Sequence, residues 1–509
     1  MATLAREVED LTADGYDIEL LGFGADELTA LLNGEYEQNQ ETQEKKAEKA
    51  EKVPVLLPVA VSCTGDVWQL GRHRIMCGSS ADRANVLHLM EGKQAIVFYF
   101  PHHRIGGVSI LFLRMAEYLS SKFSVYVADY SDGYMANHLS SNVKLLRIDQ
   151  GDHFPEGSIY IFQSFLPWRF PFLAKVDPHS KVFFWNLHPN NFDPSIFNEK
   201  INFYPFKIIA KLINFLAWKR KNKVKKVINY LVRNQGLEFM DVENVRSTED
   251  FIGERLDIKK FLPIATPKLN ERNQYTSHSE VKLGWIGRLA DFKYRILEHL
   301  MHRLSQLNIE NKTITLTIVG DGDYRDYLKR EATLLGSSSF RIIFIGELSP
   351  HDLHKYMREN IDIVFSMGSS ALEAASMGLP VFLTDYSYEK IKYNYNFSML
   401  YEKKGYCLGE KINNQSFEEG CSLRKSIVDV INNYDFYSQL CHQYWKNNFS
   451  LDSVANSLDV RMNLSTATFA DMKKKGFFTP DKFGLLMRTV GWRLRLRNLK
   501  EVVGFRHDC

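Results

Sequence analysis

The chain has 509 residues, of which 45% are hydrophobic and 25% are charged, and its formal net charge is +3. This length is too great for one hydrophobic core, so two or three domains are expected in an ordinary globular protein. The small net charge does not by itself indicate a nucleic-acid partner, and no apolar run approaches the roughly 20 residues of a membrane-spanning helix.

The six cysteines and the N-terminus indicate the compartment. The cysteines form no Cys-x-x-Cys pair and no zinc-type spacing, which fits a reducing, cytosolic setting. The N-terminus is acidic rather than basic and then apolar, so a cleavable signal is not expected. We therefore expect a cytoplasmic protein.

The first 52 residues have the pattern of two segments. In residues 1–34 short helices are expected, because Asp26 precedes the amphipathic run 27–32 as an N-cap and Gly34 follows it as a stop signal. Residues 35–52 contain almost no apolar side chain, which predicts a polar linker. Together they predict a small helical remnant that is separated from the rest of the chain.

Residues 53–94 change character again. Their stretch 64–82 resembles the region just upstream of the catalytic core in phage- and plasmid-type DNA amino-methyltransferases, which often carry a partition-protein-like N-terminal domain. The residues that carry the match are Trp68, Leu70, Gly71, His73, Arg74, Cys77 and Gly78. Ser79 stands where that family usually has Asp, and the Asp-Pro-Pro-Tyr of those enzymes is replaced by AIVFYFPHHRIGG. The resemblance implies a truncated methyltransferase-like fusion partner, with a DNA-tethering module as the alternative.

An α/β pattern begins at residue 95. The near-continuous apolar run 96–100 predicts a buried strand of a parallel sheet, and a loop with Gly106 and Gly107 leads into a helix over 108–119. Further strands are expected at 125–128, 144–147, 158–162 and 181–185. His188 follows the last strand, at the edge where α/β sheets place functional groups. For His188 both a role in the cleft and a structural role in the loop are open. A metal role is not expected, because no second His or acid lies at ligand spacing.

Two segments combine apolar and basic residues. Residues 203–226 predict an amphipathic helix whose cations gather at 219–226, and the tail 466–509 mixes aromatic and aliphatic residues with Lys and Arg from Lys473 onward. Such segments can lie on an anionic membrane surface, here the inner face of the plasma membrane. A core-packed helix with a basic end has the same pattern, so both interpretations of residues 203–226 stay open.

A second α/β pattern follows a polar linker near residue 270. Strands are predicted at 281–286, 313–319 and 340–345, each followed by glycine, and helices are predicted from Pro350 and over 433–454. Arg288 and Lys293 come directly after the first of these strands and Gly287. Two cations at a strand's carboxyl edge would offset the charge of a pyrophosphate and stabilise it as it leaves. A surface salt bridge is the alternative for Arg288.

The stretch 362–385 reads as strand, Gly/Ser loop, helix and strand, which is a βαβ crossover. Its loop contains Gly368, Ser369 and Ser370, and the free N–H groups and dipole of the following helix make a natural phosphate site. Glu373 in the first turns of that helix is placed to accept hydrogen bonds from ribose hydroxyls. A structural turn that binds nothing has the same local pattern.

Taken in this order, the motifs of residues 95–465 resemble those of the family 4 retaining glycosyltransferases of the GT-B fold (glycosyl transferases group 1). The resemblance implies that a nucleotide-sugar donor is held by Gly106, Gly107, Gly287, Arg288, Lys293, Gly368, Ser369, Ser370 and Glu373. It also implies catalytic roles for His188, Arg288 and Lys293. That family has two glutamates eight positions apart: Glu373 matches the second, which holds the ribose, and the first, which touches the transferred sugar, would fall at Phe365.

The expected fold class is α/β and GT-B, with two Rossmann-like domains facing across a cleft after a small N-terminal α+β remnant. Residues 95–270 would be the acceptor domain, 271–465 the donor domain and 466–509 a basic amphipathic tail. The expected function is retaining sugar transfer to a glycan or lipid-linked saccharide in surface polysaccharide synthesis. Neither a metal nor another cofactor is expected, because Arg288, Lys293 and helix N–H groups would replace a cation. The alternatives are a glycosyltransferase or binding module acting on modified DNA, and a non-catalytic nucleotide-sugar-binding protein.

Overall fold

The structure is a computed structural model of the chain. It describes residues 62–64, 66–70, 73–80, 89, 95–189, 191–192, 207–272, 275, 279–392, 395–412 and 422–480. The predictions for residues 1–34, 35–52 and 481–509 lie outside these residues. The chain divides into two compact units, residues 1–91 and residues 92–509.

The first unit contains an antiparallel hairpin of β1 (Val67–Leu70) and β2 (His73–Met76), in which Trp68 lies opposite Ile75. Trp68, Leu70 and Ile75 are all about half exposed. A two-stranded hairpin buries too little apolar surface to be stable alone. The remainder of the predicted segment 53–94 lies almost entirely outside the described residues.

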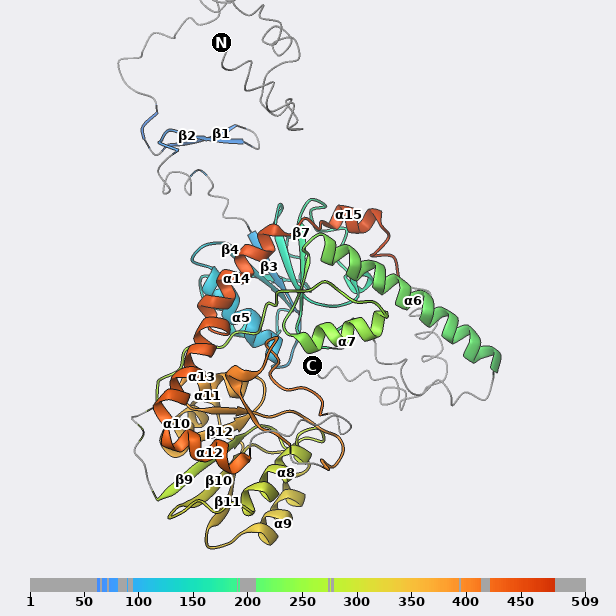
Figure 1. The fold of residues 1–509 in the computed structure, drawn as a ribbon. Helices are drawn as coiled ribbons and strands as arrows, with labels where there is room; N and C mark the ends of the chain where they lie inside the picture. The colour runs from blue at the N-terminus through green and yellow to red at the C-terminus, as the bar shows by residue number, and fades with distance from the viewer. Residues whose placement is uncertain are drawn as a thin grey trace, which may run out of the picture. The chain divides into compact units, whose positions relative to one another are not determined.

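The second unit begins with an α/β domain built on a six-stranded parallel sheet in the order β5-β4-β3-β6-β7-β8. Figure 1 labels β3, β4 and β7 of this sheet. The strands are β3 (Ala95–Tyr99), β4 (Ser124–Asp129), β5 (Lys144–Arg147), β6 (Ile159–Gln163), β7 (Lys181–Asn186) and β8 (Leu237–Phe239). The helices are α5 (Gly107–Leu119), η2 (Ala136–His138), η3 (Pro167–Arg169), α6 (Lys207–Arg233) and α7 (Val242–Ile252). Every residue of β6 is buried, which is the burial expected of an inner strand covered on both faces.

A second α/β domain follows, with a six-stranded sheet in the order β11-β10-β9-β12-β13-β14. The strands are β9 (Glu280–Ile286), β10 (Thr313–Val319), β11 (Phe340–Gly346), β12 (Ile363–Ser366), β13 (Val381–Leu383) and the antiparallel edge strand β14 (Ser398–Met399). The helices are α8 (Tyr294–Ser305), α9 (Arg325–Leu335), α10 (Pro350–Asn360), α11 (Ser369–Ser376), η5 (Leu400–Glu402) and α12 (Leu423–Asn432). The strand order reverses between β9 and β12, and open α/β sheets bind ligands at such a reversal.

The predicted α/β fold class with two Rossmann-like domains is therefore confirmed. Each expected strand from 96–100 to 381–383 is present within one or two residues of its predicted ends. Among the described residues, no helix combines the length and the apolar character that crossing a membrane requires.

The C-terminal helices differ from the prediction. Instead of one helix over 433–454 the chain forms α13 (Tyr434–Asn448) and α14 (Leu451–Leu464), because Ser450 ends the first and caps the second by accepting the N–H of Ser453. Helix α14 packs on α5 of the first α/β domain, and α15 (Phe469–Lys474) adds Phe469 and Met472 to the core beside its sheet. Residues 466–480, which the sequence groups with a basic tail, thus complete the first α/β domain.

Candidate functional site

A cavity of about 500 Å³ opens at the carboxyl edge of the second sheet. It is enclosed by the loops after β9, β10 and β11 and by the start of α11. Its lining residues are Ile286, Gly287, Arg288, Val319, Gly320, Asp321, Gly322, Glu347, Leu348, Leu353 and Ser370. Both the volume and the position beside the strand-order reversal are typical of a small-molecule site.

The loops around the cavity touch one another through their backbones. Gly320 has φ +139°, and a Cβ added there would lie 2.1 Å from the carbonyl oxygen of Gly287. The Gly320 N–H donates to the oxygen of Gly346 at 2.8 Å, and the Leu289 N–H donates to the oxygen of Asp321 at 2.9 Å. Only glycine combines this backbone angle with so close an approach. The contact fixes the loop that carries Arg288.

Arg288 and Lys293 form a pair of cations beside this cavity. Arg288 is exposed, while Lys293 precedes α8 and its Nζ lies 3.6 Å from the point where a Cβ on Gly287 would be. Burial, together with the charge of Arg288, lowers the pKa of Lys293 to about 8. Within the described part of the chain, no carboxylate forms an ion pair with either side chain. Two like charges held together in this way are stabilised by a bound anion.

The start of α11 faces the same region. Gly368 is its N-cap with φ +66°, no side chain caps the helix, and a Cβ on Gly368 would meet no atom within 4 Å. Ser369 is exposed and Ser370 lines the cavity. The N–H groups of the first turn are therefore open to an anion. The hydroxyl of Ser366, at the end of β12, donates to the carbonyl of Ile286 and joins this helix start to the loop of Arg288.

Glu373 lies one turn into α11 and its side chain is 17% exposed. Its Oε2 is 3.3 Å from Nε2 of His354 on α10. Arg114 of α5, in the first α/β domain, is the second basic group that acts on it: burial lowers the pKa of Arg114, and the Glu373 carboxylate opposes that shift. Neither His354 nor Arg114 could be identified from the sequence, since neither lies in a recognisable motif.

Phe365 occupies the position at which the resemblance implies a glutamate that touches the transferred sugar, but its side chain lies in the core. It is fully buried in β12, where its ring stacks on Phe382 at 4.9 Å and meets Phe397 at 5.5 Å. Strand β12 ends at Ser366 and α11 begins at Ser369, so the loop is short. The position eight residues before Glu373 therefore falls inside the strand, and its side chain belongs to the hydrophobic core.

The predicted site residues of the first α/β domain lie at the carboxyl edge of its own sheet. Gly106 is the extended N-cap of α5, and a Cβ on Gly107 would meet nothing within 4 Å. His188 follows β7, where its backbone N–H donates to Asn191 and burial lowers its pKa, so the ring is neutral at pH 7. These three residues do not line the 500 Å³ cavity. Of the predicted donor-site residues, Gly287, Arg288 and Ser370 line this cavity.

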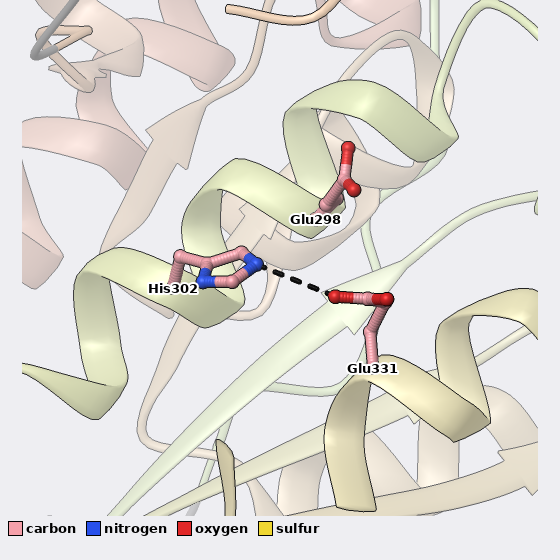
Figure 2. Close-up of side chains that lie close together, drawn as sticks. All are labelled: Glu298, His302 and Glu331. Atoms are coloured by element: carbon pink, nitrogen blue, oxygen red, sulfur yellow. Dashed lines mark ion pairs between the residues drawn. The ribbon is translucent and has the colours of Figure 1, made fainter. Parts of the chain in front are cut away.

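A further cluster of acidic and histidine side chains lies between α8 and α9 (Figure 2). The ligand atoms of Glu298, His302 and Glu331 are within 4.8 Å of one another. Glu298 already accepts hydrogen bonds from Tyr327 at 2.5 Å and from Arg295 at 3.0 Å. His302 follows Lys293 by nine residues, which is roughly 14 Å along the helix axis. The cluster is an ion-pair network between two helices, outside the candidate site.

Two parts of the chain match known families. Residues 280–403 match the family described as Glycosyl transferases group 1, and residues 2–63 match the ParB-methyltransferase HTH domain. The first range contains Arg288, Lys293, Ser370 and Glu373, and the second confirms the predicted partition-protein-like N-terminus. No curated protein sequence matches the chain.

Solved structures with a similar arrangement include three that the chain covers almost completely. HepE from Anabaena, solved with UDP and glucose, is 15% identical over 72% of this chain and 99% of that one, with a TM-score of 0.39. A glycosyltransferase from Rickettsia africae is 13% identical over 74% and 99%, with a TM-score of 0.43. The lipopolysaccharide outer core galactosyltransferase WaaB is 10% identical over 73% and 99%, with a TM-score of 0.43.

At these identities the likeness does not extend to a substrate. The family match, in contrast, covers the loops and the helix start that enclose the cavity. Residues 280–403 are therefore a glycosyl transferases group 1 domain, carried in one chain with an N-terminal segment of the ParB-methyltransferase HTH type.

Proposed function

We propose that the chain transfers a sugar from a nucleotide-sugar donor to an acceptor hydroxyl with retention of the anomeric configuration. The observation that carries this proposal is the cation pair Arg288 and Lys293, of which Arg288 lines the cavity together with Ser370 at the open N-terminus of α11. Cationic side chains and free helix N–H groups are the groups that bind a diphosphate. The family match over residues 280–403 supports the same reaction.

Each part of the donor has a place in this proposal. The nucleoside occupies the cavity against Leu348 and Leu353, and its ribose hydroxyls donate to Glu373. The diphosphate lies between Arg288, Lys293 and the first turn of α11. As the bond between the anomeric carbon and the phosphate oxygen breaks, negative charge grows on that oxygen, and the two cations stabilise it without a metal. His188, held neutral by burial, contacts the transferred sugar.

The acceptor in this proposal is a glycan or lipid-linked saccharide of a surface polysaccharide pathway. The proposal also includes an anionic membrane surface as a partner, because Trp218 and Lys219 are both exposed on α6. A second candidate function, transfer to modified DNA bases, is favoured by the ParB-methyltransferase HTH match of residues 2–63. The two differ in the chemistry of the acceptor.

A nucleotide screen tests the proposed function. Calorimetric titration of the full chain with UDP, GDP and ADP should show saturable one-site binding of at least one of them, because the cavity and the cation pair are already formed. Incubation with the matching nucleotide-sugars should then release nucleoside diphosphate. If none of the three nucleotides binds, or if Arg288→Ala and Lys293→Ala bind them as the wild type does, the assignment of the site is wrong.

Deprotonation of Lys293 should make the affinity for the donor depend on pH. With a pKa of about 8, its charged fraction falls from about nine tenths at pH 7 to about one tenth at pH 9. Because a diphosphate favours the charged form, affinity for the nucleotide should fall by up to about tenfold over this range. Lys293→Arg keeps its charge at both pH values and should lose the dependence. Equal pH slopes for the wild type and Lys293→Arg would contradict the assignment.

The same group should affect the stability of the free protein. The pKa of Lys293 in the folded chain lies below its ordinary value of 10.5, so between about pH 8 and pH 10.5 the unfolded chain binds a proton that the folded chain has lost. The contribution of this group to folding stability should therefore rise with pH across that window. Denaturant unfolding of the wild type and Lys293→Met at several pH values would measure it.

A further inference from the structure

Three aromatic side chains gather beside the cation pair, on two loops of the second α/β domain. Phe292 precedes Lys293, while Tyr386 and Tyr388 follow β13. The ring centroids of Phe292 lie 5.9 Å from Tyr386 and 6.5 Å from Tyr388, and the two tyrosine rings are 6.1 Å apart. Tyr388 is 56% exposed. The ring of Tyr388 is therefore accessible to a ligand at the surface, with two partly buried rings beside it.

Backbone hydrogen bonds hold the two loops in place. The Ser387 N–H donates to the carbonyl of Phe292 at 3.0 Å, and the Ser387 hydroxyl donates to the carbonyl of Glu389. The Tyr386 N–H donates to the carbonyl of Glu410 at 2.9 Å, and its own carbonyl accepts from Ile412 at 2.8 Å. The backbones that carry Phe292 and Tyr386 are thus held in place before any ligand arrives, which lowers the entropic cost of binding.

The position of the cluster relates it to the proposed donor site. The Lys293 ammonium lies 5.6 Å from the centre of the Phe292 ring, and the same nitrogen faces Gly287. Along the sheet, in the order β11-β10-β9-β12-β13, the cavity lies over the ends of β11, β10 and β9, and the aromatic cluster follows β13. A donor with its nucleoside in the cavity and its diphosphate at the cations therefore points its sugar toward the aromatic cluster.

The first α/β domain meets this region as well. The N–H of Val242, at the start of α7, donates to the carbonyl of Gly405 at 2.9 Å. The charge of Glu243 on the same helix acts on the hydroxyl of Tyr386. The aromatic cluster thus lies where the carboxyl end of β8 and its following helix approach the second domain, beside the predicted position of the reacting sugar.

Charges of both signs surround the rings: the Lys293 ammonium lies beside Phe292, whereas carboxylates act on the two tyrosines, which carry the argument for the ligand. Aromatic faces attract the C–H groups of a sugar ring, and they also stack on nucleic-acid bases. Two carboxylates act on this cluster, Asp291 on Tyr388 and Glu243 on Tyr386. Carboxylates accept hydrogen bonds from sugar hydroxyls but repel the phosphates of a nucleic acid. A hydroxyl-rich ring without phosphate fits both features.

We propose that Phe292, Tyr386 and Tyr388 form a platform on which a saccharide unit of the acceptor packs, so that the acceptor is a saccharide rather than DNA. This proposal rests on the proposed function, since it locates the acceptor by the position of the donor. The ring of Phe292 lies beside Lys293, so the test is made on Tyr388, the most exposed of the three rings.

Saturation-transfer NMR on the full chain tests the platform with defined probes: the methyl glycosides of glucose, galactose and N-acetylglucosamine, each in both anomers, with and without UDP, GDP or ADP. At least one probe should receive saturation on its ring C–H protons. Tyr388→Ala should weaken that probe's binding by about three- to tenfold, and Tyr388→Phe should retain it, because the ring face carries the contact. Nucleotide affinity should be unchanged in both variants.

The matched control is Phe436→Ala, which removes an aromatic ring that is 59% exposed on α13 and should change nothing. The platform is overturned if no glycoside is saturated, if Tyr388→Ala binds the probe as the wild type does, or if a duplex oligonucleotide displaces the probe. Nucleotide titration of the same samples separates the two proposals. Nucleotide binding without glycoside binding removes the platform alone, whereas glycoside binding without nucleotide binding removes the proposed function and leaves a saccharide-binding surface that is not an acceptor site.

Discussion

Replacing Arg288 with alanine should lower the turnover number by about two to three orders of magnitude, and it should weaken nucleotide binding much less. The reason is that negative charge on the departing phosphate oxygen is greatest in the transition state, so a cation placed there acts more on the rate than on ground-state affinity. Arg288 lines the cavity and is exposed. Its removal should therefore leave folding intact.

Variants at the same position separate charge from shape. Arg288→Lys should recover only part of the activity, because a point charge cannot reproduce the two-pronged hydrogen bonding of a guanidinium. Lys293→Ala should resemble Arg288→Ala, and the double variant should be far from additive if the two cations act on one group. Arg330→Ala, an exposed arginine on α9, is the matched control. If Arg288→Ala lowers the melting temperature but keeps its turnover, the arginine is structural.

The order of the strands and the places of Arg288, Lys293 and Ser370 could be predicted from the sequence, because they depend on local patterns. Strand β9 ends at Ile286 and α8 begins at Tyr294, so both cations fall in the intervening loop by chain connectivity alone. The Gly/Ser loop and the helix start at Ser369 follow in the same way. A run of buried strands in a fixed order leaves few arrangements open.

The short loop between β12 and α11 explains why the position eight residues before Glu373 lies inside a strand. A count of eight positions back from Glu373 reaches Phe365, which belongs to the apolar run 363–365 that the sequence already marks as a strand. Because β12 continues to Ser366, the counted position is a core residue. In the proposed function His188, rather than a residue of this loop, contacts the transferred sugar.

Contacts between distant segments could not be read from periodicity. Phe469 and Met472 belong to a stretch whose mixture of apolar and basic residues suggested a surface tail, yet both are buried beside the first sheet. Local amphipathicity has the same pattern whether the apolar face meets lipid or a core. The proximity of Phe292 to Tyr386 and Tyr388, and of His354 to Glu373, depends in the same way on tertiary packing.

Glu373→Gln should weaken donor binding by roughly 1.5–3 kcal/mol, because the glutamine keeps the size of the side chain but loses the charge-assisted hydrogen bonds to the ribose. Folding should change little, since the Glu373–His354 pair is partly exposed, at 17% and 26%, and such pairs contribute at most about 1 kcal/mol. Glu310→Gln, an exposed acid after α8, should behave as the wild type.

His354→Ala distinguishes a direct role of Glu373 from an indirect one. If Glu373 binds the ribose itself, the loss of its histidine partner should weaken donor binding less than Glu373→Gln does, because the carboxylate keeps its charge and its place on α11. If the carboxylate instead serves to hold His354, the two variants should lose the same affinity. Calorimetric titration of both variants with the nucleotide that the wild type prefers gives this comparison. An unchanged Michaelis constant and turnover number in Glu373→Gln would remove Glu373 from the donor site.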